Sequence, residues 1–172
     1  RLGSTGVETL AITATEAADD ADAKDYAIDL QDTTGIETLT ITLAGTDDNF
    51  KVTNASGVTA LKLAGTQAAA TNVVSVAGAT SLTVTNTAAV GGTAADLTAA
   101  DATTVTIKQG NASATAFDTA TFAKATNVTL GGADKATDGT AYAGAVTVAT
   151  LDAAALTDLA VDSTNGKVTV ST

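Results

Sequence analysis

Residues 34–42 read TGIETLTIT, and residues 5–13 read TGVETLAIT, so the chain carries nearly the same nine residues twice. Both copies begin with the Thr-x-x-Glu spacing of a helix capping box. The residues that follow alternate between apolar and polar, which is the period of a β-strand rather than of a helix. We therefore read the phrase as a corner that leads into a strand, with Gly35 in the turn, Ile36 packed inward and Glu37 in solvent.

The strand part of the phrase recurs along the chain as an apolar–any–apolar triplet. Its seven copies begin at Leu10, Leu39, Leu61, Leu82, Val105, Val128 and Leu159. The intervals are 29, 22, 21, 23, 23 and 31 residues, and such a period is the signature of a solenoid. A second apolar segment, such as Phe50 and Val52, precedes most triplets, with a polar or glycine-containing corner between the two. The sequence therefore predicts an all-β fold, a parallel β-solenoid (β-helix) with coils of about 21–23 residues.

Two intervals are longer than the others, and each contains a polar stretch. The first contains ATEAADDADAKD (14–25) and the second contains GGADKATDGTAYAG (131–144). Loops that project from one edge leave a stacked core intact, so we predict two longer loop insertions here. A short Ala-rich helix is the alternative for the first stretch, and also for residues 151–160.

In a parallel stack, equivalent residues of successive coils lie ~4.8 Å apart and form ladders. One expected inward ladder consists of Leu39, Leu61, Leu82, Val105 and Val128. Its expected neighbour consists of Ile41, Leu63, Val84, Ile107 and Leu130. On the outer face we expect a threonine row of Thr40, Thr83, Thr106 and Thr129, interrupted by Lys62.

The whole chain, residues 1–172, is expected to form a single β-solenoid segment. KVTVS (167–171) resembles the first strand of a coil with no second strand after it, and residues 2–7 resemble the corner before the first triplet. An open solenoid end needs a cap, and the sequence shows none. The hypothesis is that the chain is an internal piece of a longer repeat array.

Charge and composition argue against several classes of function. The chain has 8 Lys and Arg against 19 Asp and Glu, a net charge of −11. Such a surface repels nucleic acid and anionic membranes, and no apolar run approaches the ~18 residues of a membrane span, so neither nucleic-acid binding nor membrane insertion is expected. The chain has no Cys and no His, the usual nucleophile, base and zinc ligands. We expect no enzyme activity, and any bound metal to be a hard ion held by oxygen atoms.

Calcium is the cofactor that the acidic stretches suggest, because it takes six to eight oxygen ligands. The candidate ligands are Asp19, Asp20, Asp22 and Asp25 in the first insertion, Asp47 and Asp48 after Gly45, and Asp134 and Asp138 in the second insertion. The first cluster lacks the EF-hand spacing. The stretch GGADKATDG (131–139) is similar to the calcium-binding GGxGxDx repeat, but has a single copy and Ala133 and Asp134 in place of glycine. The alternative for all three stretches is a solvated loop.

Four phrases carry a resemblance to a known family. They are TGVETLAIT (5–13), TGIETLTIT (34–42), SGVTALKLAGT (56–66) and GATSLTVTNT (78–87). They resemble phrases of bacterial surface-layer (S-layer) proteins of the Caulobacter type and of related RTX-like exoproteins, which are exported by type I secretion. The resemblance implies a secreted structural protein at the cell surface, ordered by calcium and self-assembling through lateral contacts between identical subunits. A cell-surface polysaccharide would be bound through another region.

Two other classes of protein share this composition. An adhesin or biofilm-matrix repeat would bind a host or sugar surface instead of forming an ordered lattice. An ice-binding protein would use a flat outer face of threonines, for which Thr40 and Thr42, Thr83 and Thr85, and Thr104 and Thr106 are candidates. Lys62 interrupts that face.

Overall fold

The structure is a computed structural model that describes residues 3–15, 25–45, 49–67, 73–86, 96–109, 115–133, 145–163 and 168–170. Within these ranges every regular element is a strand, and all paired strands are parallel. The predicted all-β parallel solenoid is therefore confirmed. In the same ranges there is no helix with the length and apolar character that a membrane crossing requires.

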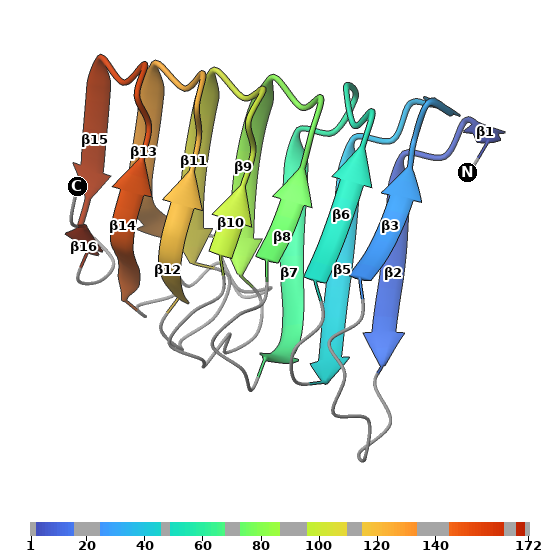
Figure 1. Ribbon diagram of the computed structural model, residues 1–172, viewed down its shortest axis with the longest axis horizontal. Coiled ribbons are helices and arrows are strands. Elements are labelled where there is room, and N and C mark those ends of the chain that lie inside the picture. The colour runs from blue at the N-terminus through green and yellow to red at the C-terminus, as the bar shows by residue number, and fades with distance from the viewer. Residues whose placement is uncertain are drawn as a thin grey trace.

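Two sheets of seven strands make up the stack (Figure 1). Sheet I contains the triplets, in the order β2 (Thr9–Thr15), β5 (Thr38–Gly45), β7 (Ala60–Gln67), β9 (Ser81–Asn86), β11 (Thr104–Gln109), β13 (Asn127–Ala133) and β15 (Asp158–Asp162). Sheet II contains β3 (Asp25–Asp29), β6 (Asn49–Thr53), β8 (Val73–Val76), β10 (Asp96–Thr98), β12 (Thr115–Thr121), β14 (Val146–Asp152) and β16 (Val168–Val170). A short pair, β1 (Gly3–Thr5) and β4 (Asp32–Thr34), lies beside the first coils.

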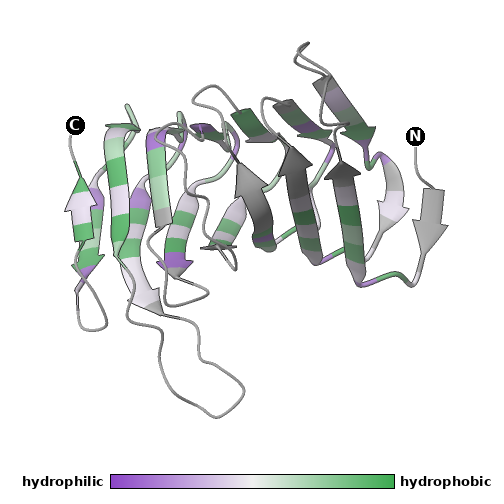
Figure 2. Cartoon of the chain, turned by 90° about the horizontal axis from the view of Figure 1, so that it is seen from below, coloured by the Kyte–Doolittle hydropathy of each residue, from purple (hydrophilic) through white to green (hydrophobic). Residues whose placement is uncertain are grey.

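The core is the thin apolar layer between the two sheets. Side chains alternate between inside and outside along each strand, as in β8, where Val74 and Val76 are buried and their neighbours are half-buried. Figure 2 shows the alternation as apolar and polar bands across the strands. The largest buried side chains are Phe50, Phe117 and Phe122. With so few aromatics, the layer is filled mostly by Leu, Ile, Val and Ala, which suits a narrow space between two flat sheets.

The corners from sheet II to sheet I add a further row to the core. From the second coil on, the residue three positions before each triplet occupies this row: Ile36, Val58, Ala79, Ala102 and Ala125, which are buried, and Leu156, which is partly buried; the equivalent Val7 of the first coil is exposed. In the second coil Ile36 is only 3% exposed, Glu37 is exposed, and Gly35 has φ +95°. This confirms our reading of TGIETLTIT as a corner and a strand, and excludes the capping box. Glycine is needed here because a side chain at that φ is strained.

The ladders expected in sheet I are broken once, between β7 and β9. Leu61 lies opposite Val84 and not opposite Leu82, and Leu63 lies opposite Asn86. The expected pairs are found at the interfaces on either side. The prediction of two continuous ladders was therefore wrong at this interface, where the register is displaced by two residues.

The expected threonine row is altered by the same displacement. Thr83 lies opposite Ala60, whereas Lys62 lies opposite Thr85. The row from Thr83 through Thr106 and Thr129 is present, but it continues through Ala60 to Thr38 instead of reaching Thr40. Lys62 lies opposite Thr40, as expected, but its partner on the other side is Thr85, so the prediction that Thr40 and Lys62 share a row with Thr83 was wrong.

A shorter corner accompanies the displaced register. Val52 of β6 lies opposite Val76 of β8, so the two corners start level. Nine positions separate Val52 from Leu61, but six separate Val76 from Leu82. Val84 stands eight positions after Val76, and it is Val84, not Leu82, that lies level with Leu61. A shift of two residues keeps each side chain on its own face, so the core stays apolar.

Two further expectations concern the end of the chain and the possible helices. Residues 151–160 form the end of β14, a corner and the start of β15, so the helical alternative is excluded there. For the first insertion, residues 16–24 lie outside the described residues. The KVTVS segment contains β16, which pairs with β14 in sheet II as a first strand of a coil should.

Candidate functional site

Of the eight candidate calcium ligands, one lies within the described part of the chain. Asp25 begins β3, and its backbone pairs with Asn49 of β6. The other seven, Asp19, Asp20, Asp22, Asp47, Asp48, Asp134 and Asp138, lie outside the described residues. The calcium site therefore stays a prediction.

The structure describes the strands that flank these acidic stretches. All three stretches connect the end of a sheet I strand to the start of a sheet II strand, so their flanking strand ends lie on one edge of the stack (Figure 1). The first two stretches are flanked by neighbouring strands, since β2 pairs with β5 and β3 pairs with β6. The third follows β13, four strands from β5 in sheet I, or about 19 Å along the stack. The strands that flank the first two stretches thus belong to adjacent coils, and the strands that flank the third lie apart from them.

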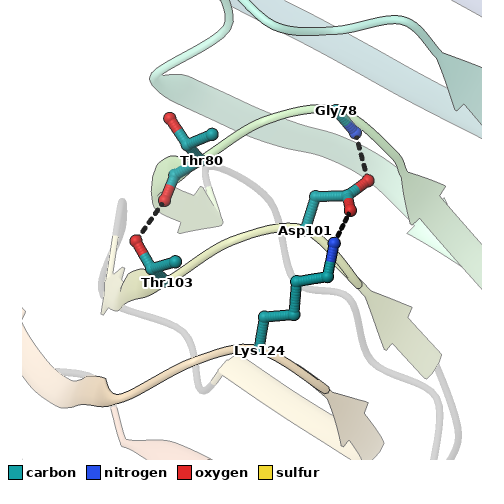
Figure 3. A network of polar contacts seen from close by, with 5 residues as sticks. All are labelled: Gly78, Thr80, Asp101, Thr103 and Lys124. Atoms are coloured by element: carbon teal, nitrogen blue, oxygen red, sulfur yellow. Dashed lines mark hydrogen bonds and ion pairs between the residues drawn. The ribbon is translucent and has the colours of Figure 1, made fainter.

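Asp101 is the centre of a polar network on the corners of three successive coils (Figure 3). Its Oδ2 accepts the Gly78 N–H at 2.9 Å, and its Oδ1 lies 2.7 Å from the Lys124 Nζ. The hydrogen bond from Lys124, then that from Gly78, and then the lysine charge lower the pKa of the Asp101 carboxyl. Both side chains are open to solvent, at 37% and 65% exposed, so the ion pair itself contributes little stability.

Threonines on the same corners form a second polar ladder. The Thr103 Oγ1 donates to the Thr80 carbonyl at 3.1 Å, the Thr126 Oγ1 to the Thr103 carbonyl at 3.3 Å, and the Thr157 Oγ1 to the Thr126 carbonyl at 2.9 Å. Each bond joins one coil to the next. The sequence reasoning missed this role, although the signal is present: Thr stands two positions before five of the seven triplets, and Glu before the other two.

Other described carboxylates are bound to the backbone of the corners and strands. The Asp96 Oδ1 accepts the Thr119 N–H at 3.0 Å. The Asp29 Oδ1 accepts the Gln31 N–H at 2.9 Å and the Asn54 Nδ2 at 2.8 Å. Asn54 has φ +57°, a conformation that asparagine tolerates better than most residues. These acids hold the coils together, and within the described ranges no cluster of three or more Asp or Glu forms a possible metal site.

The outer face of sheet II is hollowed where β12 and β14 meet. The hollow, of about 310 Å³, is lined by Ala116, Phe117, Asp118, Thr147 and Ala149. Phe117 and Ala120 both face the core, so two successive residues of β12, at positions 118 and 119, lie between them. The paired strand β14 does the same between Val148 and Leu151. This irregularity and the small side chains make a shallow depression with a single carboxylate.

The outer face of sheet I carries rows of threonine and alanine with a few lysines. One row runs through Thr38, Ala60, Thr83, Thr106 and Thr129. Its neighbour contains Lys62, Thr85 and Lys108. The face repeats at the spacing of the coils, but it is not a uniform threonine surface.

Comparison with protein-family models, with curated proteins and with solved structures finds no match for this chain.

Proposed function

We propose that the chain is a structural segment of a secreted bacterial surface layer, in which identical subunits assemble into a calcium-dependent lattice on the cell surface. The observation that carries the proposal is the stack itself, two parallel sheets of seven strands whose outer faces repeat from coil to coil. A repeating face suits repeated lateral contacts between copies. The described carboxylates of Asp29, Asp96 and Asp101 bond to other parts of the stack, which fits a structural role. The surface-layer family is chosen because four phrases of the sequence resemble phrases of S-layer proteins.

Calcium would act at the edge of the stack in this proposal. The acidic stretches before β3 and before β6 are flanked by strands of adjacent coils. Six carboxylates there (Asp19, Asp20, Asp22, Asp25, Asp47 and Asp48) match the number of oxygen ligands that calcium requires. Asp134 and Asp138 would supply a second, separate site.

Electron microscopy of the full-length protein that carries this chain tests the proposal. Ordered sheets are expected with calcium, and their loss with a calcium chelator. A variant with Asp19, Asp20 and Asp22 changed to Asn should require more calcium for assembly. The matched control changes three exposed residues outside these stretches, Asp118, Asp152 and Asp158, to Asn, and so removes the same amount of negative charge. Calcium-independent assembly, or an equal effect of both variants, would contradict the calcium part of the proposal, and no ordered sheets under any condition would contradict the lattice.

One observation favours ice binding as a second candidate function. Thr83, Thr106 and Thr129 form an outward row with the spacing of the coils. The row is short, and Lys62 projects from the neighbouring row. Thermal hysteresis in a dilute solution of the chain would support ice binding over the surface-layer proposal. Binding to a sugar or host surface without ordered sheets would instead support an adhesin or matrix repeat.

A further inference from the structure

In sheet I, the interface between β7 and β9 differs from both adjoining interfaces in the register of its triplets. Between β7 and β9, Leu61 lies opposite Val84, whereas the triplets of the adjoining interfaces align first residue with first residue. The corner hydrogen bonds show the same displacement. The Thr59 carbonyl accepts the N–H of Thr83, which lies inside the next triplet. At other interfaces the corner carbonyl accepts N–H groups that precede the triplet, as Thr80 does from Thr103.

The corners change at the same interface. Upstream, the corner residue in the core is large, as in Ile36 and Val58, and in the next three coils it is Ala79, Ala102 or Ala125, before Leu156 in the last. The stack therefore joins a set of wide corners to a set of narrow ones. Apart from the partly buried Leu156, all of these residues are buried, so both kinds of corner pack against the core.

The displaced register also matches side chains less well than its neighbours do. Leu63, which is 5% exposed, lies opposite Asn86 instead of another large apolar residue. In sheet I, β7 and β9 pair at four positions, against eight between β5 and β7 and six between β9 and β11. Cross-strand apolar pairs and ladder hydrogen bonds stabilise a sheet, so fewer of both weaken this interface.

A second register is within reach at this interface. Sliding β9 by two residues would place Leu82 against Leu61 and Val84 against Leu63, and every side chain would keep its face. In those pairs the triplets align first residue with first residue, as they do at the adjoining interfaces. The short corner after Val76 opposes the slide. Apolar matching and corner length thus favour different registers, and this conflict is absent where both corners have the same length.

We infer that the interface between β7 and β9, with β6 and β8 beside it, is a shear seam. The stack opens at the seam before it opens at the adjoining interfaces, and the open seam can close again in the register shifted by two residues. The inference does not depend on the proposed function. For any rod of this kind, the seam is the place that yields first to a pulling or shearing force.

Amide exchange measured by NMR tests the opening. The Thr83 N–H donates across the seam at 2.8 Å, and the Thr103 and Thr126 N–H groups donate across the next interfaces at 2.8 and 2.9 Å. Thr83 is half-buried and Thr103 is exposed, so solvent access alone predicts slower exchange at Thr83. The seam predicts the opposite order, with exchange at Thr83 about tenfold faster than at Thr103. Equal or slower exchange at Thr83 would overturn the inference.

Engineered disulfides test the two registers, since the chain has no cysteine of its own. Ala60→Cys with Thr83→Cys joins residues that are opposite one another, where the Cα atoms lie about 5 Å apart. Ala60→Cys with Ser81→Cys joins residues that are opposite only in the shifted register and lie about 8 Å apart in this one, too far for a disulfide. Thr38→Cys with Ala60→Cys is the control pair, opposite one another away from the seam.

The control pair and the Ala60–Thr83 pair should close quickly under mild oxidation. The Ala60–Ser81 pair should close slowly, at the rate at which the seam opens. If the Ala60–Ser81 disulfide formed as fast as the control disulfide, the observed register would be overturned. If it did not form in the time in which the Thr83 amide exchanges completely, the shift of β9 to the second register would be overturned. Closing the Ala60–Thr83 disulfide should slow exchange at Thr83 to the rate of Thr103, whereas closing the control disulfide should not.

Discussion

Replacing Val105 with Asp places a carboxylate in the apolar layer between the two sheets. Val105 is 0% exposed and lies between Leu82 and Val128, each 1% exposed. Loss of the valine costs about 2 kcal/mol of burial. The aspartate has no partner there, so it folds as the neutral acid, and protonating it at pH 7 costs about 4 kcal/mol from an ordinary pKa near 3.9. The total, about 6 kcal/mol, is comparable to the whole stability of a typical domain.

The sign of the pH dependence separates the charge from the lost packing. Burial raises the pKa of the new carboxyl in the folded state, so its penalty is absent below about pH 4 and grows as the pH rises. Val105→Asn loses similar packing but does not titrate. Relative to Val105→Asn at the same pH, Val105→Asp should therefore be less stable by several kcal/mol at pH 7 and about equal at pH 4.

Urea unfolding followed by circular dichroism measures both differences. Thr106→Asp, one position along and on the outer face, is the matched control, and it should change the stability by less than about 1 kcal/mol. If Val105→Asp unfolds at the same urea concentration as the wild type at pH 7, the assignment of Val105 to the core is refuted. A difference from Val105→Asn that persists at pH 4 would refute the account based on charge.

Three further substitutions test the corners. Gly78→Ala should lower the free energy of unfolding by roughly 1–3 kcal/mol, because φ is +96° and the new Cβ would lie 2.9 Å from a backbone nitrogen. Gly6→Ala is the control, with φ +82° but open space around the new Cβ, and it should lower the stability less in the same urea titration. Lys124→Met should move the pKa of Asp101 up toward its ordinary value, as measured by NMR, and an unchanged pKa would contradict the ion pair. The lowered pKa of Asp101 stabilises the folded state at pH values above the ordinary carboxyl pKa, and this stabilisation is lost as the pH falls. The free energy of unfolding of the variant should therefore be slightly lower than that of the wild type near neutral pH and equal to it in strong acid. Thr126→Val should cost about 1 kcal/mol through the lost bond to the Thr103 carbonyl, and a neutral result would show that this ladder is not stabilising.

Much of the corner chemistry could be predicted from the sequence once the period was known. Asp101 and Lys124 are 23 residues apart, which is one coil, so equivalent corner positions bring them together. The threonines two positions before the triplets follow the same rule. The acidic stretches are different, because Asp19 and the other candidates stand between strands, and periodicity places their flanking strands but not their side chains.

The pattern of TGIETLTIT and its relatives was sufficient for the fold class, the period and the inward residues. Those properties are local: alternation along a strand decides which face each side chain takes, and a fixed interval decides that the strands stack. The register between β7 and β9 was decided by the tertiary structure. A shift of two residues leaves the inward and outward pattern unchanged, so the sequence pattern cannot distinguish the two registers. The observed register goes with a shorter corner, six positions from Val76 to Leu82 against nine from Val52 to Leu61, and the two lengths can be compared only once β8 lies on β6.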